Sequence, residues 1–305
     1  MAMSITHTSI AGAHARIAGD IRRTPILCLE DGLCLKLEQL QRGGSFKTRG
    51  AFNRLRQAGD LAAGVAAASG GNHGVAVALA ARALGAQATI FVPEVSSPAK
   101  QARIAALGAR LVVGGAGYAD ALAASQRHVA ETGAIAVHAY DQPDILAGQG
   151  TVAREWQEQA PDLTHVLVAV GGGGLIGGMA AWYAGSTTQV VAVEPETSCA
   201  LHAALAAGRP VDVPVSGIAA DSLGARQVGG LMFPIAQAHI AQSVLVTDAA
   251  ISEAQRWLWA ECAVLAEPGG AAALAALRSG AFVPPPGARV GVLVCGSNTA
   301  PGSVA

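Results

Sequence analysis

The sequence predicts an α/β protein built around a mainly parallel, buried sheet. Short runs of β-branched residues alternate with alanine-rich segments along almost the whole chain, as expected for βαβ units. Glycine follows several of the alanine-rich segments, at the position where helices commonly end. Three successive helix–glycine–strand units of similar length indicate a compact α/β lobe between about residues 54 and 141.

Each expected element has its own signal. Strands are expected where short apolar runs carry strand-forming residues, at 65–68, 88–93, 110–115, 134–140, 165–170, 189–194 and 289–295. Helices are expected at 74–84, 98–107 and 118–132, which are followed by Gly85, Gly108 and Gly133. The stretch 208–243 is rich in Gly, Pro and Ser and is expected to be an irregular, functional loop.

One segment has the length of a membrane span. Residues 163–193 contain no Asp, Glu, Lys or Arg. Inside it, however, a glycine cluster and a short helix separate two strand-like runs. The pattern therefore predicts strand, turn, helix and strand in place of a membrane helix.

Net charge and cysteine content indicate which kinds of partner and which cellular compartment to expect. The formal net charge is -1 and Lys and Arg are scattered, so no surface for nucleic acid or an anionic membrane is expected. Five cysteines without a C-x-x-C pair fit reduced thiols. The first residues lack the apolar region of a secretory signal. We expect a cytoplasmic protein that acts on a small molecule.

A glycine-rich loop directly follows the expected strand 165–170. Residues 172–177 match G-x-G-x-x-G and open a helix, and Glu194 ends the next strand about 20 residues further on. Backbone N–H groups at such a helix start approach an anion closely, and the helix dipole favours a phosphate. On these residues alone, an NAD-dependent oxidoreductase is one hypothesis, and a tight turn without a ligand is another.

A second glycine loop, 68-ASGGNHG-74, lies between an expected strand and an expected helix. It presents Ser69, Asn72 and backbone amides at the helix start, which suits a carboxylate. The structural alternative is that Ser69 or Asn72 only caps the helix. His73 is either a base or a packed side chain, because a helix N-terminus disfavours its cationic form.

Lys47 lies in the stretch 41-QRGGSFKTRGAF-52. This stretch suggests a phosphate-binding P-loop, but Phe46 stands where that motif needs glycine. A lysine is ordinarily an exposed surface charge, whereas the small and aromatic residues on both sides of Lys47 indicate partial burial. A buried lysine has a lowered pKa and provides the neutral amine that a Schiff base requires.

The last expected strand ends at Cys295, followed by a Gly-Ser-Asn turn. Ligands of open α/β sheets bind outside the carboxyl ends of the strands, so this thiol is expected to face a site. No cationic neighbour is evident that would make it a catalytic thiolate. We predict a weak hydrogen-bonding role, with an inert buried thiol as the alternative.

Five motifs together are similar to those of the serine/threonine dehydratase family of pyridoxal-phosphate enzymes, which have fold type II and are related to tryptophan synthase β and serine racemase. They are S-F-K-x-R-G-A, S-G-G-N-H, G-G-G-G-L, E-P-G-G-A and C-G-S-N, in the family's order, within a resemblance from about Thr24 to Asn298. The resemblance implies two open, mainly parallel twisted sheets with flanking helices. It also implies a large cofactor-binding domain of residues 1–53 and 142–305, and a small substrate-binding domain of residues 54–141.

The resemblance assigns roles to four of the five motifs, all but E-P-G-G-A. Lys47 is the catalytic residue and binds pyridoxal phosphate covalently, Phe46 lies along one face of the pyridine ring, and Asn72 bonds the 3′-oxygen. Cys295 meets the pyridine nitrogen. The 5′-phosphate is held by Gly171, Gly172, Gly173, Gly174 and Leu175. The substrate carboxylate is held by Ser69, Gly70, Gly71, Asn72 and His73.

Two positions depart from the patterns of relatives in this family. Racemases of the group have a serine that acts as a second base where this chain has Gly70, so racemisation is not expected as the main activity. Relatives that bind a divalent cation have another acid six residues after the glutamate that matches Glu194, and here that residue is Ala200. A weaker, monovalent cation site would use Glu194 and Ser198.

The predicted function is a lyase that converts L-threonine, L-serine or a related β-hydroxy amino acid to a 2-oxo acid and ammonia. An amino-acid racemase and a β-replacing synthase of the same fold are the alternatives within the class. The NAD-dependent oxidoreductase is the alternative outside it. A cytoplasmic homodimer is expected, with no nucleic-acid or membrane partner.

Overall fold

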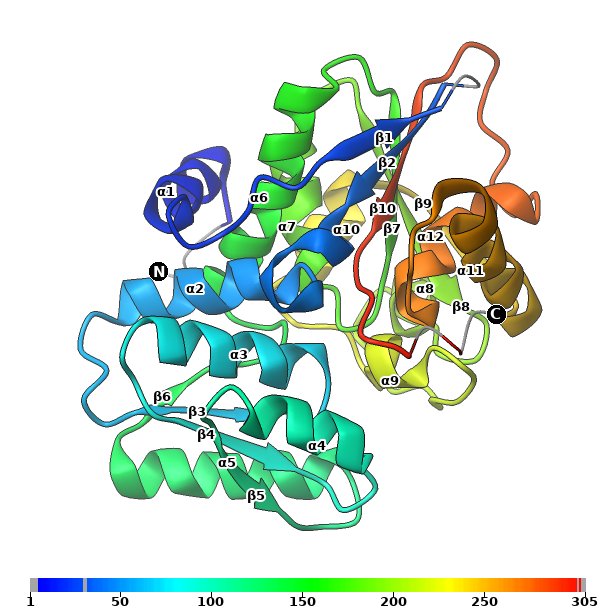
Figure 1. Ribbon diagram of the computed structural model, residues 1–305. Helices are drawn as coiled ribbons and strands as arrows, with labels where there is room; N and C mark the ends of the chain where they lie inside the picture. The colour runs from blue at the N-terminus through cyan, green and yellow to red at the C-terminus, as the bar shows by residue number, and fades with distance from the viewer. Residues whose placement is uncertain (1–4, 30–31, 301, 303–305) are drawn as a thin grey trace.

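The computed structural model describes residues 5–29, 32–300 and 302, and these residues form two sheets flanked by helices (Figure 1). The larger sheet has the strand order β1-β2-β10-β7-β8-β9, in which β1 is antiparallel to β2 and the other neighbours are parallel. The smaller sheet, β5-β4-β3-β6, is parallel throughout. The predicted fold class is confirmed.

The larger sheet draws its strands from both ends of the chain: β1 (Ile26–Cys28), β2 (Leu33–Leu37), β7 (His165–Ala169), β8 (Gln189–Pro195), β9 (Ile240–Val246) and β10 (Val290–Val294). The smaller sheet uses one continuous region: β3 (Val65–Ala68), β4 (Ala88–Val92), β5 (Arg110–Val113) and β6 (Ile135–Ala136). Strands β4, β7 and β10 are buried along their whole length. Burial on both faces explains why they are continuous apolar runs in the sequence.

Helices cover both sheets. Against the larger sheet, α6 (Pro143–Gln159) and α7 (Gly174–Tyr183) pack on one side, while α11 (Asp248–Cys262) and α12 (Pro268–Arg278) lie on the other (Figure 1). The smaller sheet lies between α5 (Tyr118–Thr132) on one face and α3 (Asn72–Ala83) with α4 (Pro98–Ala105) on the other. The remaining helices are α1 (His7–Ile17), α2 (Lys47–Ala58), α8 (Ala200–Ala207), α9 (Ala220–Leu223) and α10 (Phe233–His239).

Helix α2 connects the two layered units, because it packs against α3 on one side and α6 on the other. Its contact with α6 is made through glycine: an ideal Cβ on Gly148 would lie 2.7 Å from the Cα of Gly50. Helix α7 meets α6 in the same way, since a Cβ on Gly178 would lie 2.2 Å from the carbonyl oxygen of Leu146. This close packing fixes the start of α2 relative to the start of α7.

A buried ionic network holds α2 to β2 and α6. Arg49 Nη2 lies 2.6 Å from Glu38 Oε1 and 3.1 Å from Glu155 Oε2, and Lys36 Nζ lies 2.5 Å from Glu155 Oε1. The side chains of all four residues are at most 1 % exposed. An unpaired charge buried here would cost several kcal/mol, so each of these charges depends on its partners.

Most expected elements are confirmed with small shifts at their ends. The helix expected at 118–132 is Tyr118–Thr132, and Gly133 ends it at φ 74°. The segment expected at 134–140 is a strand over only two residues, because the chain then turns and His138 Nδ1 accepts the N–H groups of Tyr140 and Asp141. The charge-free segment is β7, a glycine turn, α7 and β8, as predicted. Across the described residues, no helix has the length and apolar character that would let it span a membrane.

Two expectations are wrong. The stretch 208–243 is not wholly irregular, because it contains α9, α10 and the beginning of β9, which pairs in parallel with β8. Cys28 and Cys34 form a disulfide and are not reduced thiols. The antiparallel register of β1 and β2 places these two residues directly opposite each other, with Cα atoms 4.0 Å apart.

Candidate active site

The ends of several strands bring the predicted site residues together. Lys47 begins α2, Asn72 begins α3 shortly after β3, Gly174 begins α7 after β7, and Cys295 directly follows β10. A narrow slot of about 40 Å³ is lined by the expected cofactor residues Phe46, Lys47, Asn72, Gly171, Gly172, Gly173, Gly174, Leu175 and Cys295. The fold thus gathers residues up to 249 positions apart around one slot.

Lys47 is the basic group of this slot. Its Nζ donates a 2.7 Å hydrogen bond to the carbonyl oxygen of Ala139 and lies 5.2 Å from the centroid of the Phe46 ring. Burial lowers the pKa of Lys47 to about 8, although Cys295 and Glu267 act in the opposite direction. A neutral, nucleophilic amine therefore forms at a much lower pH than on an exposed lysine.

The glycine loop before α7 has no room for side chains. An ideal Cβ on Gly172 would lie 2.3 Å from the Tyr140 ring, and one on Gly173, at φ 87°, would lie 2.5 Å from Met232 Cε. Among the described residues, no side chain caps the first turn of α7. Its backbone N–H groups, together with the positive end of the helix dipole, are therefore suited to bind an anion such as a phosphate.

Helix α3 also starts without a capping side chain from the described residues, so the capping role considered for Ser69 and Asn72 is not found. Ser69 Oγ instead accepts the N–H of Gly71 at 3.2 Å. Asn72 is held on both sides: its Nδ2 donates to Glu267 Oε1 at 2.5 Å, and its Oδ1 accepts from Asn298 Nδ2. The free amides at this helix start are suited to a carboxylate.

His73 is packed and neutral. It is 4 % exposed, its Nε2 lies 2.9 Å from the carbonyl oxygen of Val137, and burial together with the nearby charge of Lys47 lowers its pKa to about 3. Of the two roles considered for His73, the packed side chain fits this geometry. The neutral ring leaves substrate binding in this loop to the backbone.

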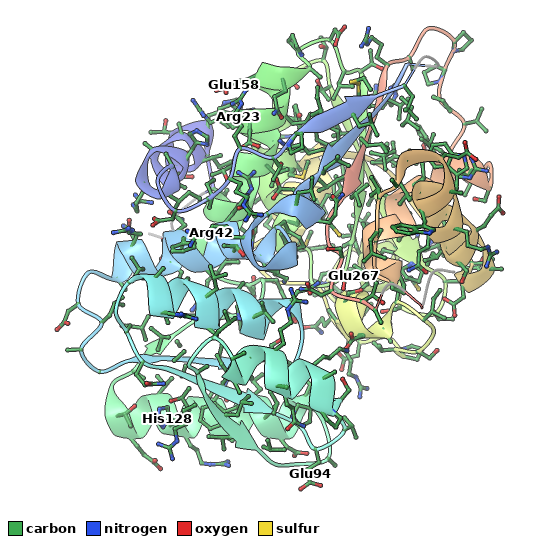
Figure 2. The ribbon with its side chains drawn as sticks, in the orientation of Figure 1. Arg23, Arg42, Glu94, His128, Glu158 and Glu267 are labelled. Carbon is green, nitrogen blue, oxygen red and sulfur yellow. A yellow bond between two sulfur atoms is a disulfide. The ribbon has the colours of Figure 1, made fainter. Side chains whose placement is uncertain are left out.

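Glu267 belongs to the site, although the sequence motif that contains it suggested no role. It stands immediately before α12, is 5 % exposed, and lies where elements of the two sheets face each other (Figure 2). Burial raises its pKa to about 7. Its position in the motif E-P-G-G-A was the available signal, but its contact with Asn72, 195 residues earlier, was not predictable.

Cys295 is a neutral thiol at the back of the slot. It is buried, its Sγ donates a weak 3.4 Å hydrogen bond to the carbonyl oxygen of Gly269, and burial raises its pKa far above the usual range. The charge of Lys47 lowers that pKa only slightly in comparison. These contacts suit the hydrogen-bonding role expected for Cys295 and do not favour a nucleophilic thiolate.

The slot opens into a cavity of about 590 Å³. Lys47, Asn72, Tyr140 and Gly172 line both spaces, so the lysine stands where they join. Ser69, Gly71 and His73 also face the larger cavity, whereas Gly70 lines a separate small pocket. Of the five residues expected to bind substrate, Gly70 is thus the one turned away from the larger cavity.

Glu194 and Ser198 lie outside the slot and the larger cavity. Both carboxylate oxygens of Glu194 accept backbone N–H groups at the start of α8, from Leu201 at 2.8 Å and His202 at 2.7 Å. Ser198 Oγ donates to the carbonyl oxygen of Leu223 at 3.0 Å. The described part of the chain holds no group of three or more His, Cys, Asp or Glu suited to a metal ion. Glu194 is also fully buried, which disfavours a ribose-binding role.

Comparison with known proteins points to one family. A family model described as "Pyridoxal-phosphate dependent enzyme" matches residues 17–296. A phenylserine dehydratase of Ralstonia pickettii is 36 % identical, with 96 % of this chain and 93 % of that protein covered. An L-threonine ammonia-lyase of Geobacter sulfurreducens is 37 % identical over 90 % of this chain and 71 % of that protein. A maize serine racemase structure superposes with TM-score 0.93 and 32 % identity, covering 99 % and 96 % of the two chains.

Proposed function

The chain belongs to the pyridoxal-phosphate dependent enzymes, and from this premise we propose that it is a lyase acting on a β-hydroxy amino acid such as L-threonine or L-serine. The substrate would lose its Cα proton and its β-hydroxyl as water, and one water would then replace nitrogen at Cα. The products are a 2-oxo acid and ammonia. The observation that carries the proposal is the Lys47 amine at the junction of a glycine-lined anion slot and a substrate-sized cavity.

The residues present fit pyridoxal phosphate. In the slot, the backbone amides of Gly171 to Gly174 would bind the phosphate. Where the slot joins the larger cavity, the poorly solvated amine of Lys47 would react with the aldehyde. Neutral Cys295 suits an unprotonated ring nitrogen, and Phe46 provides an apolar ring beside Lys47. When bound, this group would stabilise negative charge at the substrate Cα.

The chain's own residues would position the substrate and move its proton. We propose that the loop 69–73 at the start of α3 binds the substrate carboxylate, which leaves Cα near the end of the Lys47 side chain. The amides of Ser69 and Gly71 are already bonded, to Phe91 and to Ser69 Oγ, so the other amides of this loop would make the contact. The neutral amine of Lys47 would then take the Cα proton. Asn72, held by Glu267 and Asn298, would keep its amide in one orientation toward the slot.

Racemisation is the second candidate, because serine racemases are among the similar proteins. Two-sided proton exchange at Cα needs a base on each face of the substrate, and Gly70 has no side chain to provide the second. We therefore keep elimination as the main activity. A β-replacing synthase is disfavoured because its substrate loop typically contains T-S-G-N-T, unlike 69-SGGNH-73.

Several expectations about the whole molecule are retained as proposals. We propose the domains 1–53 with 142–305 and 54–141, a boundary that falls inside α2. We also propose a cytoplasmic homodimer. A monovalent cation at Glu194 and Ser198 would have to compete with the backbone N–H groups that Glu194 already accepts.

The test is a spectrum followed by an assay. Purified protein incubated with pyridoxal phosphate should gain a visible absorbance band that borohydride removes, and peptide mapping should then locate the modification at Lys47. Lys47→Ala should lack both the band and 2-oxo acid formation from L-threonine, with Lys100→Arg, which keeps the charge and does not line the slot, as a control for lysine loss. A wild-type protein that stays colourless would refute the cofactor assignment, and a coloured protein that forms no 2-oxo acid would refute the lyase.

A further inference from the structure

The cavity beside Lys47 is larger than a threonine side chain requires. Its volume of about 590 Å³ falls in the range of pockets that enclose sizeable organic ligands. Part of it adjoins Gly172 and Leu223, which also line the proposed cofactor slot. The remainder extends from Lys47 between the first turn of α5 and the segment 215–227, where a substituent on the substrate Cβ would lie.

The walls of this outer part carry two aromatic rings and several small apolar side chains, beside the polar side chains of Ser222 and Gln227. Tyr118 opens α5 and Tyr140 follows β6, and both line the cavity. Partial burial raises the pKa of both hydroxyls, so both rings stay neutral. Small or branched apolar residues complete the wall, namely Ala119, Ala139, Val215, Ala220 and Ala225.

Charged groups on this wall are already paired or stand at its edge. Asp221 of α9, which lines the cavity, forms an ion pair with Lys100 of α4, which does not. Arg226 is exposed at the rim. His73 is neutral and hydrogen bonded to the carbonyl of Val137. A charged substrate side chain would therefore have to disturb one of these contacts or remain at the rim.

We infer that the preferred substrate carries an aromatic ring on its β-carbon, so that the substrate class is the β-aryl-β-hydroxy-α-amino acids. Tyr118 and Tyr140 are the specificity-determining residues, because neutral aromatic rings favour an offset or edge-on contact with another ring. A methyl group or hydrogen at that position would leave most of the outer cavity filled with water. The inference rests on the proposed function, and the product would be a 3-aryl-2-oxo acid plus ammonia.

The first experiment measures binding without turnover. L-Phenylalanine and L-2-aminobutyrate lack the β-hydroxyl and differ only in a phenyl against a methyl group. Calorimetric titration of the enzyme loaded with pyridoxal phosphate should give at least about tenfold tighter binding of L-phenylalanine, since larger apolar groups in a fitted pocket gain a factor of this order. Equal affinities, or tighter binding of L-2-aminobutyrate, would overturn the inference.

The second experiment compares turnover. The ratio of kcat/KM for 3-phenylserine to kcat/KM for L-threonine should be about ten or more in the wild type. Tyr118→Ala should lower this ratio, while the matched variant Tyr118→Phe keeps the ring and should keep the ratio. Tyr118 is 44 % exposed, so neither change threatens folding. Ala225→Phe adds a ring to the opposite wall and should also lower the ratio by filling the space.

These outcomes separate the inference from the proposed function. If L-threonine yields a 2-oxo acid and 3-phenylserine does so no faster, the lyase proposal stands and the aryl preference is wrong. If neither amino acid yields a 2-oxo acid, both are wrong. An unchanged substrate ratio in Tyr118→Ala and Ala225→Phe would show that this wall does not contact the substituent, which also overturns the inference.

Discussion

The Lys47 amine donates a 2.7 Å hydrogen bond to the carbonyl oxygen of Ala139. Lys47 begins α2 beside the larger sheet, whereas Ala139 lies on the chain as it returns from the smaller sheet. The amine is thus held at the line where the two layered units meet. The amine becomes a nucleophile only after it loses a proton, and either of the two N–H groups that remain can still donate to Ala139.

Reaction of the apoprotein with free pyridoxal should depend on the ionisation of Lys47. Because burial lowers the lysine pKa to about 8, the neutral amine appears as pH rises through that value, and covalent capture should accelerate between about pH 7 and 9. Pyridoxal is preferred to its phosphate because it lacks the titrating phosphate group. The rate at which the visible absorbance of the adduct appears at each pH measures this capture, and loss of the absorbance on borohydride treatment identifies the adduct. Lys47→Arg is the unreactive control. A midpoint at the pKa of an exposed lysine would contradict the burial argument.

Gly172→Ala should weaken retention of the cofactor. The added methyl would meet the Tyr140 ring at 2.3 Å, so either the ring or the loop has to move, and the loop amides lose their alignment. We expect at least about a tenfold rise in the dissociation constant for pyridoxal phosphate, the equivalent of one lost charge-assisted hydrogen bond. Equilibrium dialysis of the variant measures it.

Two further variants control that experiment. Gly12→Ala adds a methyl where no heavy atom lies within 4 Å, so cofactor affinity should stay at the wild-type value. Combining Gly172→Ala with Tyr140→Ala removes the colliding ring and should recover part of the lost affinity. If the double variant is no better than Gly172→Ala alone, the collision with Tyr140 is not the cause.

Gly70→Ser tests the second-base argument, but the structure requires a companion change. A Cβ on Gly70 would lie 2.5 Å from Ser96 Oγ, so a serine at position 70 competes for space with Ser96. We expect little racemisation in Gly70→Ser alone and more in the double variant with Ser96→Ala. Conversion of L-serine to D-serine by chiral chromatography reports it. Equal, background-level racemisation in Ser96→Ala and in the double variant would show that a hydroxyl at position 70 is insufficient.

Glu267 should make the apoprotein less stable as pH rises. Burial raises its folded-state pKa to about 7, above the ordinary glutamate value of 4.5. Between these values the folded state binds more protons than the unfolded state, so stability falls with pH through this window. Glu267→Gln removes the charged form. The free energy of unfolding of this variant, relative to that of the wild type, should therefore rise by up to about 3 kcal/mol between pH 4.5 and pH 8. Denaturant titrations at both pH values measure the difference.

Glu131→Gln provides the reference for that comparison, because Glu131 lies exposed on α5. The difference in free energy of unfolding between Glu131→Gln and the wild type should change little between pH 4.5 and pH 8. If Glu267→Gln behaves like Glu131→Gln, the carboxyl of Glu267 is not held protonated in the fold.

Local signals predicted the fold and much of the slot. Glycine after an apolar run marked the ends of helices, and strand ends placed Gly172 and Cys295 at one edge because parallel strands share that edge. Lys47 follows no strand directly, and its role was expected from the family resemblance. The sequence could not predict contacts that depend on three-dimensional register. The disulfide of Cys28 with Cys34 depends on the antiparallel pairing of β1 and β2. The Asp31-Gly32 dipeptide between the two cysteines is a hairpin signal, but it does not by itself fix which residues face each other.

Polar contacts between residues far apart in the chain also could not be predicted from the sequence. Arg49 meets Glu155 across 106 residues, and Asn72 meets Glu267 across 195. A charged residue in an amphipathic helix is ordinarily exposed, so nothing local distinguished Arg49 from a surface arginine. Its burial follows only from the way α2 is enclosed between β2 and α6.

The glycine contacts of α2, α6 and α7 limit how this chain can diverge. A methyl group on Gly148 would meet the Cα of Gly50, and one on Gly178 would meet the carbonyl oxygen of Leu146. A substitution at one of these positions cannot be accommodated by trimming its neighbour, because the neighbour presents main chain and not a side chain. Related sequences are therefore expected to keep glycine at these helix crossings even where the surrounding helix surfaces accept many substitutions.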